Sequence, residues 1–337
     1  MSGDGVRVYW TLRVFLSVFG ILLVPVVAHS QVKILADAHF DASVEQPYYL
    51  KSHPVVVFDE AHSNYHTAAG RYEPLARLLR NDGYTIVPGK SEFLRKGLRG
   101  VSVLLIANAL GKEVTDAISR AAFTEKECKE VSAWVRAGGS LLLIADHTPF
   151  GSAAANLSSQ FGVEMGNSYV FDLANSTDDD PTILVFSSDN GLLGDHIITR
   201  GVTPSETVSR VVAFTGQSLI IPSGATELMK LSSTAYEAPT RQDLDEAEEA
   251  AAKSPPDIAG IIAHAKPVAG RAQGVALSHG KGRVVIVGEA AMFSAQILSG
   301  EEGHEDEKFG MNTPGNDDKR FVLNVFHWLS EAGRKQK

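Results

Sequence analysis

Short apolar runs alternate with amphipathic segments between residues 54 and 160. The segment 72–80 carries apolar residues at helical spacing, and a second helix is predicted to begin at Thr124, where Glu127 completes a capping box. The predicted strands are 54–59, 84–87, 101–107 and 140–145. Strands this apolar are typical of a parallel sheet covered by helices on both faces. The pattern therefore predicts a doubly wound, mainly parallel α/β fold in three layers, of flavodoxin type.

The pattern is less regular from about residue 162 to 267, which we interpret as an insertion. Strand-like runs occur there, and the Ala-, Glu-, Asp- and Pro-rich segment 237–257 is predicted to be a solvated loop with one short helix. Regular order then returns. The elements predicted outside the loop are strands at 182–186, 210–214 and 218–221, a hairpin of 274–278 with 283–288, a helix at 290–298, a polar loop at 300–318 and a final amphipathic helix at 320–329. Residues 31–337 are thus expected to form a single domain with an irregular insertion.

The N-terminus has the three parts of a secretory signal. Arg7 and Arg13 are followed by an apolar run over 14–28, and Ala28-His29-Ser30 places small residues where signal peptidase reads them. We therefore expect residues 1–30 to be removed and the mature chain to begin at Gln31, in the periplasm or outside the cell. An uncleaved anchor is the alternative, and membrane contact is then expected through this segment alone.

Composition narrows the classes of partner and chemistry. The formal net charge of −9 disfavours nucleic acid, because phosphate binding requires a basic surface. The single cysteine, Cys128, excludes an internal disulfide. Its helical spacing with Val131 and Val135 predicts a small buried hydrophobe and not a nucleophile.

Polar side chains follow each predicted core strand. Ligands of doubly wound sheets bind beyond the carboxyl ends of the strands, so these side chains are expected to meet at one edge. Asp and Asn after a strand also commonly cap a helix or fix a turn, which is the structural alternative. The residues concerned are Asp59, Glu60, His62, Asn64, Asn108, Asp146, His147 and Glu289, with Asn316 added from the polar loop before the final helix.

Several segments resemble the class I glutamine amidotransferase-like superfamily. They are VLLIAN, FTEKECKEVSAWVRAGGSLLLIADH, GVALSHGKGRVVIVGEAAMF and NTPGNDDKRFVLNVFHWL. The resemblance covers roughly 54–161 and 274–330 and is nearest to a branch of exported or membrane-linked bacterial proteins. That branch also resembles amidotransferase-like domains of gliding-motility and intraflagellar-transport proteins. The resemblance implies the same three-layer fold.

Two of the three residues that carry glutaminase chemistry in that superfamily, the cysteine and the histidine, are missing here. Its G-x-C-x-G turn is replaced by Ala145-Asp146-His147-Thr148-Pro149, and its H-x-E pair by Gly288-Glu289-Ala290-Ala291. Thioester formation requires an activated thiolate. We therefore expect no glutamine amidotransferase activity, and the chain is more readily interpreted as a pseudoenzyme than as an enzyme.

The remaining polar residues suit three kinds of chemistry. Asp59, His62, Asp146, His147 and Glu289 are potential ligands for Zn, Fe or Mn, although no metalloprotease spacing is present and the metal ligands stay unassigned. Asp146 beside His147 also suits an acid–base pair, and such a set suits the hydroxyl groups of a sugar. The sequence favours a binding module for a small polar ligand, including carbohydrate, or for a protein partner. The alternative is a hydrolase in which Asp146, His147 and Glu289 are catalytic, with a divalent metal as an optional cofactor.

Overall fold

The computed structural model describes residues 33–93, 97–111, 121–177, 180–299 and 307–331. The predicted signal segment at 1–30 and its cleavage site lie outside these ranges, as does part of the predicted polar loop. None of the helices in the described ranges combines the length and the apolar character that crossing a membrane requires.

A mixed sheet forms the centre of the molecule and, within the described residues, has nine strands. Its parallel part runs in the order β3 (Thr85–Gly89), β2 (Val55–Asp59), β4 (Val103–Ala107), β5 (Ser140–Ile144) and β16 (Gly282–Val287). Its antiparallel part consists of β15 (Ala272–His279), β12 (Thr226–Lys230), β11 (Leu219–Ile220) and β6 (Glu164–Met165). The predicted α/β class and the hairpin β15–β16 are confirmed. The insertion contributes β6, β11 and β12 to the sheet. A strand was predicted at 218–221, where β11 lies, but not its place in this sheet, and β6 and β12 were not predicted.

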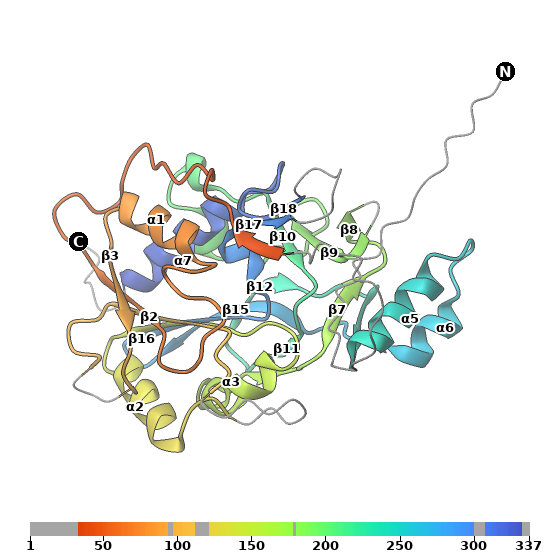
Figure 1. Cartoon of the computed structure of the whole chain (residues 1–337), viewed down its shortest axis with the longest axis horizontal. Helices are drawn as coiled ribbons and strands as arrows, with labels where there is room; N and C mark the ends of the chain where they lie inside the picture. Colours follow the sequence, from red (N-terminus) through yellow and green to blue (C-terminus); the bar gives the residue numbers. More distant parts are fainter. Residues whose placement is uncertain (1–32, 94–96, 112–120, 178–179, 300–306, 332–337) are drawn as a thin grey trace, which may run out of the picture.

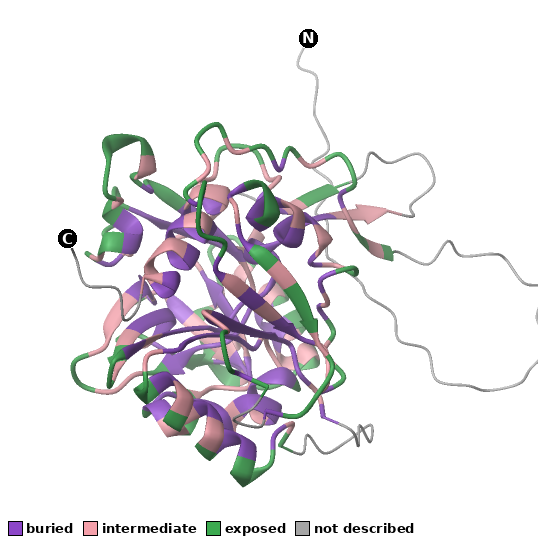
Figure 2. Ribbon diagram, turned by 90° about the vertical axis from the view of Figure 1, so that its left-hand side faces the viewer, coloured by how far each residue is buried: buried purple, intermediate pink, exposed green. Residues whose placement is uncertain are grey.

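Helices cover both faces of this sheet (Figure 1). On one face lie α1 (Glu73–Asn81) and α7 (Asp318–Ser330), and on the other lie α2 (Glu125–Arg136) and α3 (Phe150–Ser158). Successive side chains of a strand point to opposite faces, so Leu142 and Ile144 pack into one core while Leu141 and Leu143 pack into the other. Each fully buried side chain of this kind contributes roughly 1.5–3 kcal/mol. Figure 2 shows the burial concentrated in the sheet and the inner faces of its helices.

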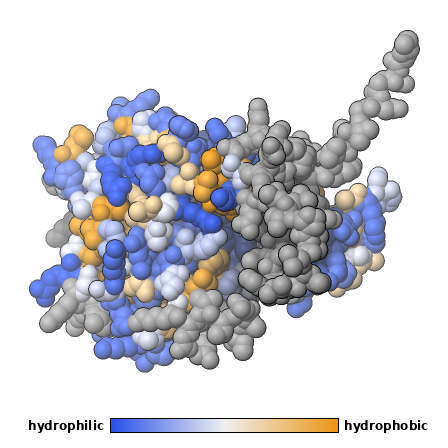
Figure 3. Space-filling model, in the orientation of Figure 1, coloured by the Kyte–Doolittle hydropathy of each residue, from blue (hydrophilic) through white to orange (hydrophobic). Residues whose placement is uncertain are grey.

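Smaller elements surround the central layers. Three further sheets each have three strands in the described residues. They are β1 (Lys33–Ala36), β17 (Ala295–Ser299) and β18 (Glu307–Gly310); β10 (Arg210–Phe214), β9 (Asp180–Ser187) and β8 (Ser176–Thr177); and β14 (Lys266–Pro267), β13 (Ala235–Ala238) and β7 (Tyr169–Asp172). The short helices are α4 (Ile197–Arg200), α5 (Arg241–Ala251), α6 (Ile258–His264), η1 (Ser159–Phe161), η2 (Pro204–Glu206) and η3 (Ala291–Phe293). The face seen in Figure 3 is mainly hydrophilic, with hydrophobic residues in small groups.

The helix predicted at 290–298 is wrong. The carboxylate of Glu289 accepts hydrogen bonds from the N–H groups of Ala291 and Met292 and supports only the single turn η3. Ser294 is then extended, and the chain continues as β17, which pairs with β1 and β18. The partner strands lie far away in sequence or in the predicted polar loop, so the local composition of 290–298 did not reveal them.

The solvated loop predicted over 237–257 is also wrong for most of its length. Thr240 caps the helix α5 by accepting a hydrogen bond from the N–H of Asp243. Leu244, Ala247 and Ala250 face a small separate core. With α6, this helix extends from the body of the molecule at the right of Figure 1. The acidic residues therefore occupy the outer face of an amphipathic helix.

Candidate functional site

The carboxyl ends of the parallel strands place several of the predicted residues together. Because β2, β4, β5 and β16 are parallel neighbours, the residues that follow them lie at the same edge of the sheet. Asn108 connects two of these loops: its side-chain oxygen accepts a hydrogen bond from the Asp146 N–H at 2.9 Å, and its carbonyl accepts one from the Tyr65 N–H at 2.9 Å. Asn108 is 1% exposed and has a left-handed backbone with φ of 49°. Asn108 therefore fixes the loops after β2 and β5 relative to each other through these two hydrogen bonds.

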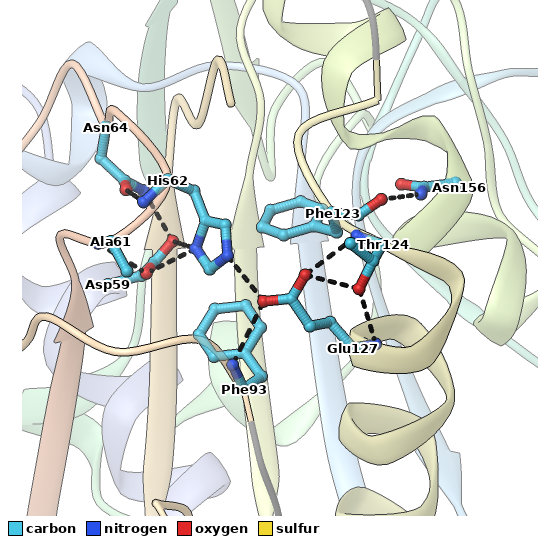
Figure 4. A network of polar contacts seen from close by, with 9 residues as sticks. All are labelled: Asp59, Ala61, His62, Asn64, Phe93, Phe123, Thr124, Glu127 and Asn156. Carbon is cyan, nitrogen blue, oxygen red and sulfur yellow. Dashed lines mark hydrogen bonds and ion pairs between the residues drawn. The ribbon is translucent and has the colours of Figure 1, made fainter. Parts of the chain in front are cut away.

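His62 lies buried between two carboxylates at this edge (Figure 4). Its Nδ1 is 2.9 Å from both oxygens of Asp59, and its Nε2 is 2.8 Å from Oε1 of Glu127. Carboxylates only accept hydrogen bonds, so both ring nitrogens donate and the imidazole is protonated. Burial alone lowers the pKa of His62, but the hydrogen bonds and charges of Asp59 and Glu127 outweigh it and raise the pKa above its ordinary value.

The surroundings of His62 give it a structural role. The rings of Phe93 and Phe123 pack at centroid distances of 4.6 and 4.9 Å from it. The second oxygen of Glu127 accepts hydrogen bonds from the N–H and hydroxyl of Thr124, so one carboxylate both caps α2 and holds the histidine. Burial raises the pKa of Glu127, but the bonds from Thr124 and His62 lower it overall.

Other residues of the same loop are also used internally. The Asn64 amide donates to Asp59 Oδ2 at 3.0 Å and its oxygen accepts from the His62 N–H at 3.2 Å. Oε1 of Glu60 accepts from the Ala68 N–H at 3.0 Å. The structure thus shows Asp59, Glu60, His62 and Asn64 bracing the loop after β2, where the sequence suggested ligand binding.

Asn316 likewise supports the backbone. Its amide donates to the Gly310 carbonyl and to Asp318 Oδ2, and its oxygen accepts from the Asp318 N–H. These bonds fix the turn that leads into α7. They give Asn316 a structural role, and its role in binding stays a prediction.

Asp146 and Glu289 are two acids close enough for the charge of Asp146 to act on Glu289. The Glu289 side chain is fully buried, whereas 15% of the Asp146 side chain is exposed. Burial raises the pKa of Asp146, although His147 and hydrogen bonds from Asn108 and Ala290 counteract this. Burial and the neighbouring charge of Asp146 raise the pKa of Glu289 well above its usual range. Both acids therefore stay protonated to a higher pH than an exposed carboxyl group would.

His147 carries the solvent-facing part of the site. It is 34% exposed, and its Nε2 lies 4.0 Å from Oδ1 of Asp146. Its Nδ1 is 3.0 Å from the carbonyl of Thr148, which can only accept. The neutral ring is therefore protonated on Nδ1 and presents the lone pair of Nε2. Asp146 and His147 together offer two acceptors at the surface.

Aromatic rings line the edge beside this pair. The ring of His147 stacks on that of Tyr169, with the ring centroids 4.5 Å apart. The centroid of the Phe150 ring lies 6.5 Å from that of His147 and 5.8 Å from that of Tyr65. Tyr65 is 49% exposed, and the guanidinium of Arg71 lies 3.9 Å from its ring centroid. Apart from His147, none of these residues was predicted from the sequence to belong to the site. Tyr65 follows Asn64 directly and could have been included, but Tyr169 comes from the insertion and gave no signal.

His66 is a second buried histidine, which the sequence pattern did not single out. It is 5% exposed, and its Nδ1 has no hydrogen-bond partner among the described residues. The ring stacks on Tyr72 at 4.5 Å, and the Tyr72 hydroxyl donates to the Ala290 carbonyl beside Glu289. Burial and then the charge of Arg71 lower the pKa of His66 to about 3, so this histidine is neutral.

The single cysteine of the chain, Cys128, does not lie at the turn after β5, where the amidotransferase-like superfamily has its nucleophile. Cys128 is fully buried in α2, and burial raises its pKa to about 12, as expected for a packing residue. The turn after β5 carries Asp146 and His147 in place of a cysteine. Among the described residues, the three side chains whose ligand atoms lie close enough to share a metal are on α5 and α6, and not at this edge.

Comparison with known proteins gives similarity in structure but not in sequence. No protein-family model and no curated protein sequence matches the chain. The N-terminal domain of mmIFT52 superposes with a TM-score of 0.54 at 16% identity, over 84% of this chain and 100% of that one. A protein described as ThuA-like from Bacteroides uniformis gives a TM-score of 0.39 at 10% identity, over 84% and 94%. A protein from Thermoplasma acidophilum described as part of a GMP synthase gives 0.38 at 11% identity, over 85% and 98%.

The similarity to the mmIFT52 domain has the highest TM-score of the three, and at 16% identity it concerns the fold alone. The chain thus has an α/β fold similar to that of the mmIFT52 N-terminal domain.

Proposed function

We propose that this protein binds a small polar ligand rich in hydroxyl groups, with Asp146 and His147 in direct contact with it. The observation that carries the proposal is the surface-facing pair itself, in which Nε2 of His147 lies 4.0 Å from Asp146 Oδ1 beside a row of aromatic rings. Carboxylate and imidazole acceptors orient hydroxyl donors, and ring faces pack against the apolar side of a sugar. A carbohydrate is the ligand class that uses both features.

Glutaminase chemistry is excluded from the proposal. The turn after β5 has no thiol, and Cys128 is buried away from it with a raised pKa. A thiol that is protonated and inaccessible cannot attack an amide. The protein would therefore use the carboxyl edge of the sheet for recognition.

A second candidate function is hydrolysis, and one observation favours it. Asp146 and Glu289 both have raised pKa values, so the pair retains a proton that a general acid could donate. Of the two, Asp146 has exposed surface, so Asp146 would contact the substrate, while its charge raises the pKa of the buried Glu289. Hydrolysis would use the same edge.

The proposed location is outside the cytoplasm. Support comes from the charged start, the apolar run over 14–28 and the small residues Ala28 and Ser30. N-terminal sequencing of the protein recovered from an extracytoplasmic fraction should give a chain that begins at Gln31. Recovery of cytosolic protein that begins at Met1 would contradict this part of the proposal.

Binding can be tested by titrating a panel of monosaccharides, oligosaccharides and polyols into residues 31–337 and measuring heat. For a ligand found in this way, His147→Ala, Asp146→Asn and Tyr65→Ala should each weaken binding by at least about tenfold, because each removes a contact worth roughly 1.4 kcal/mol. His53→Ala and Asp189→Asn are the matched controls, since both residues are exposed and His53 lies before β2, at the opposite edge. Equal affinity in the site variants and the controls would refute the site.

The two candidate functions differ in turnover. Incubation with nitrophenyl glycosides and esters should release no nitrophenol if the protein is a binding module. Release that persists in the His53→Ala control but is lost in Asp146→Asn would instead establish the hydrolase.

A further inference from the structure

The outer part of the insertion brings together three side chains with metal-binding atoms. Helices α5 and α6 pack through Leu244, Ala247 and Ile261, which are fully buried in their shared core. This packing places Asp243 and Glu246, three residues apart on one face of α5, opposite His264 at the end of α6. The cluster therefore joins two separate elements.

The geometry of the cluster suits a single small cation. Nδ1 of His264 lies 2.7 Å from Glu246 Oε2 and 3.8 Å from Asp243 Oδ1, and the three atoms all lie within 4.8 Å of one another. Ligand bonds of about 2.1 Å in tetrahedral geometry separate two ligand atoms by about 3.4 Å. The observed spacings bracket that value, so small side-chain rotations would bring the atoms to it.

The two carboxylates are oriented by neighbouring side chains. The Thr240 hydroxyl donates to Asp243 Oδ2 at 2.5 Å, and the Gln242 amide donates to Glu246 Oε1 at 2.9 Å. Each carboxylate thus has one oxygen held by a neighbour and the other directed to His264. Outer hydrogen bonds of this kind orient the ligands of protein metal sites.

The cluster is also accessible. Exposed side-chain fractions are 31% for Asp243, 38% for Glu246 and 35% for His264, so water can complete the coordination. One imidazole with two carboxylates is a donor set that suits zinc and related transition metals better than calcium or magnesium, which prefer oxygen alone.

We propose that Asp243, Glu246 and His264 bind one divalent transition-metal ion of the zinc type. The ion would link α6 to α5 and fix the outer part of the insertion. The site is separate from Asp146 and His147, so this proposal does not depend on the proposed function.

The test uses residues 31–337 freed of metal with a chelator. Titration with zinc chloride should show one zinc ion bound per protein. His264→Ala and Asp243→Asn should each weaken this binding by at least about tenfold, which is the scale of the loss when a contact that orients the metal is removed. Glu249→Gln is the matched control, because Glu249 is exposed on the same helix and outside the cluster. Cobalt(II) substitution should give visible absorption bands in the wild type that His264→Ala lacks.

Folding of each variant is checked by circular dichroism in chelator, where all should match the wild type. Zinc should also raise the melting temperature of the wild type and of Glu249→Gln, and chelator should reverse the rise. If zinc binds equally to the wild type and to His264→Ala, or binds to neither, the three residues form only an exposed ion-pair cluster and the proposal is wrong.

Discussion

Histidines in this protein have distinct roles that their environments determine. His62 faces carboxylates on both sides and is protonated, whereas His66 is buried against an aromatic ring and is neutral. His147 is partly exposed beside a single acid. The same residue type thus braces a loop, fills a core and faces solvent, and burial with partner identity decides which.

Replacing His62 should strongly destabilise the fold. His62→Leu leaves Asp59 and Glu127 buried without their shared partner, and breaking a buried ion pair in this way costs about 3–5 kcal/mol. Urea unfolding monitored by circular dichroism measures the loss. His53→Leu, at an exposed position, should change the free energy of unfolding by less than about 0.5 kcal/mol.

The contact between His62 and Glu127 also predicts how the free energy of unfolding depends on pH. His62 has a folded pKa above its ordinary 6.5, so its contribution is complete below pH 6.5 and is lost as pH rises through the folded value. Glu127 has a lowered pKa, so its contribution is present above its ordinary 4.5 and is lost as pH falls through the folded value. The alkaline loss should be absent in His62→Leu, and its persistence there would assign it to another group.

Asp146→Asn should stabilise the protein while weakening ligand binding. The raised pKa of Asp146 means that the wild type loses stability as pH rises from its ordinary 3.8 through the folded value, about 1.4 kcal/mol for each pKa unit. Asparagine cannot ionise, so the gain in free energy of unfolding should be larger at pH 8 than at pH 5. Asp189→Asn should show no such difference, and a variant less stable at pH 8 than the wild type would contradict the acid pair.

At the scale of elements, α2 does more than cover the sheet. Its capping box was evident from Thr124 and Glu127, and the structure confirms it. The contact of Glu127 with His62 spans 65 residues and had no local signal. Capping, helical spacing and apolar strands are local, so they predicted β2 to β5 and α7, whereas contacts between distant segments could not be predicted in this way.

Loss of the α2 cap should reach beyond the helix. Thr124→Ala removes a cap worth about 0.5–2 kcal/mol and also frees the carboxylate that holds His62, so its effect should lie at or above the top of that range. Thr240→Ala removes the cap of α5, but this cap does not hold a buried histidine as Glu127 does. Its loss should therefore lower the free energy of unfolding by less. Urea unfolding in chelator compares the two. Equal losses would show that the cap and the His62 contact are independent.

For the whole molecule, the central sheet separates two cores. The residues of the candidate site lie together because they follow the carboxyl ends of its parallel strands. The sequence predicted this convergence because parallel topology follows from the alternation of elements. It did not predict which of Asp59, His62, Asp146 and His147 would face solvent, since exposure depends on loops and on Tyr169 from the insertion.

Cys128 should report on global unfolding. It is fully buried between α2 and the sheet, and its pKa is raised to about 12, so a thiol reagent at pH 8 should not label the native protein. In guanidinium chloride labelling should be complete. Rapid stoichiometric labelling in native buffer would mean that α2 opens without global unfolding.

The paired helices α5 and α6 have a practical consequence for handling this protein. The turn between them, 252–256, is exposed and lies outside both main cores. Exposed loop tips are the positions where chains best accept inserted sequence. An epitope or a fluorescent reporter placed at this turn would leave β6, β11 and β12 in the central sheet, whereas excision of the whole insertion would remove three of its strands.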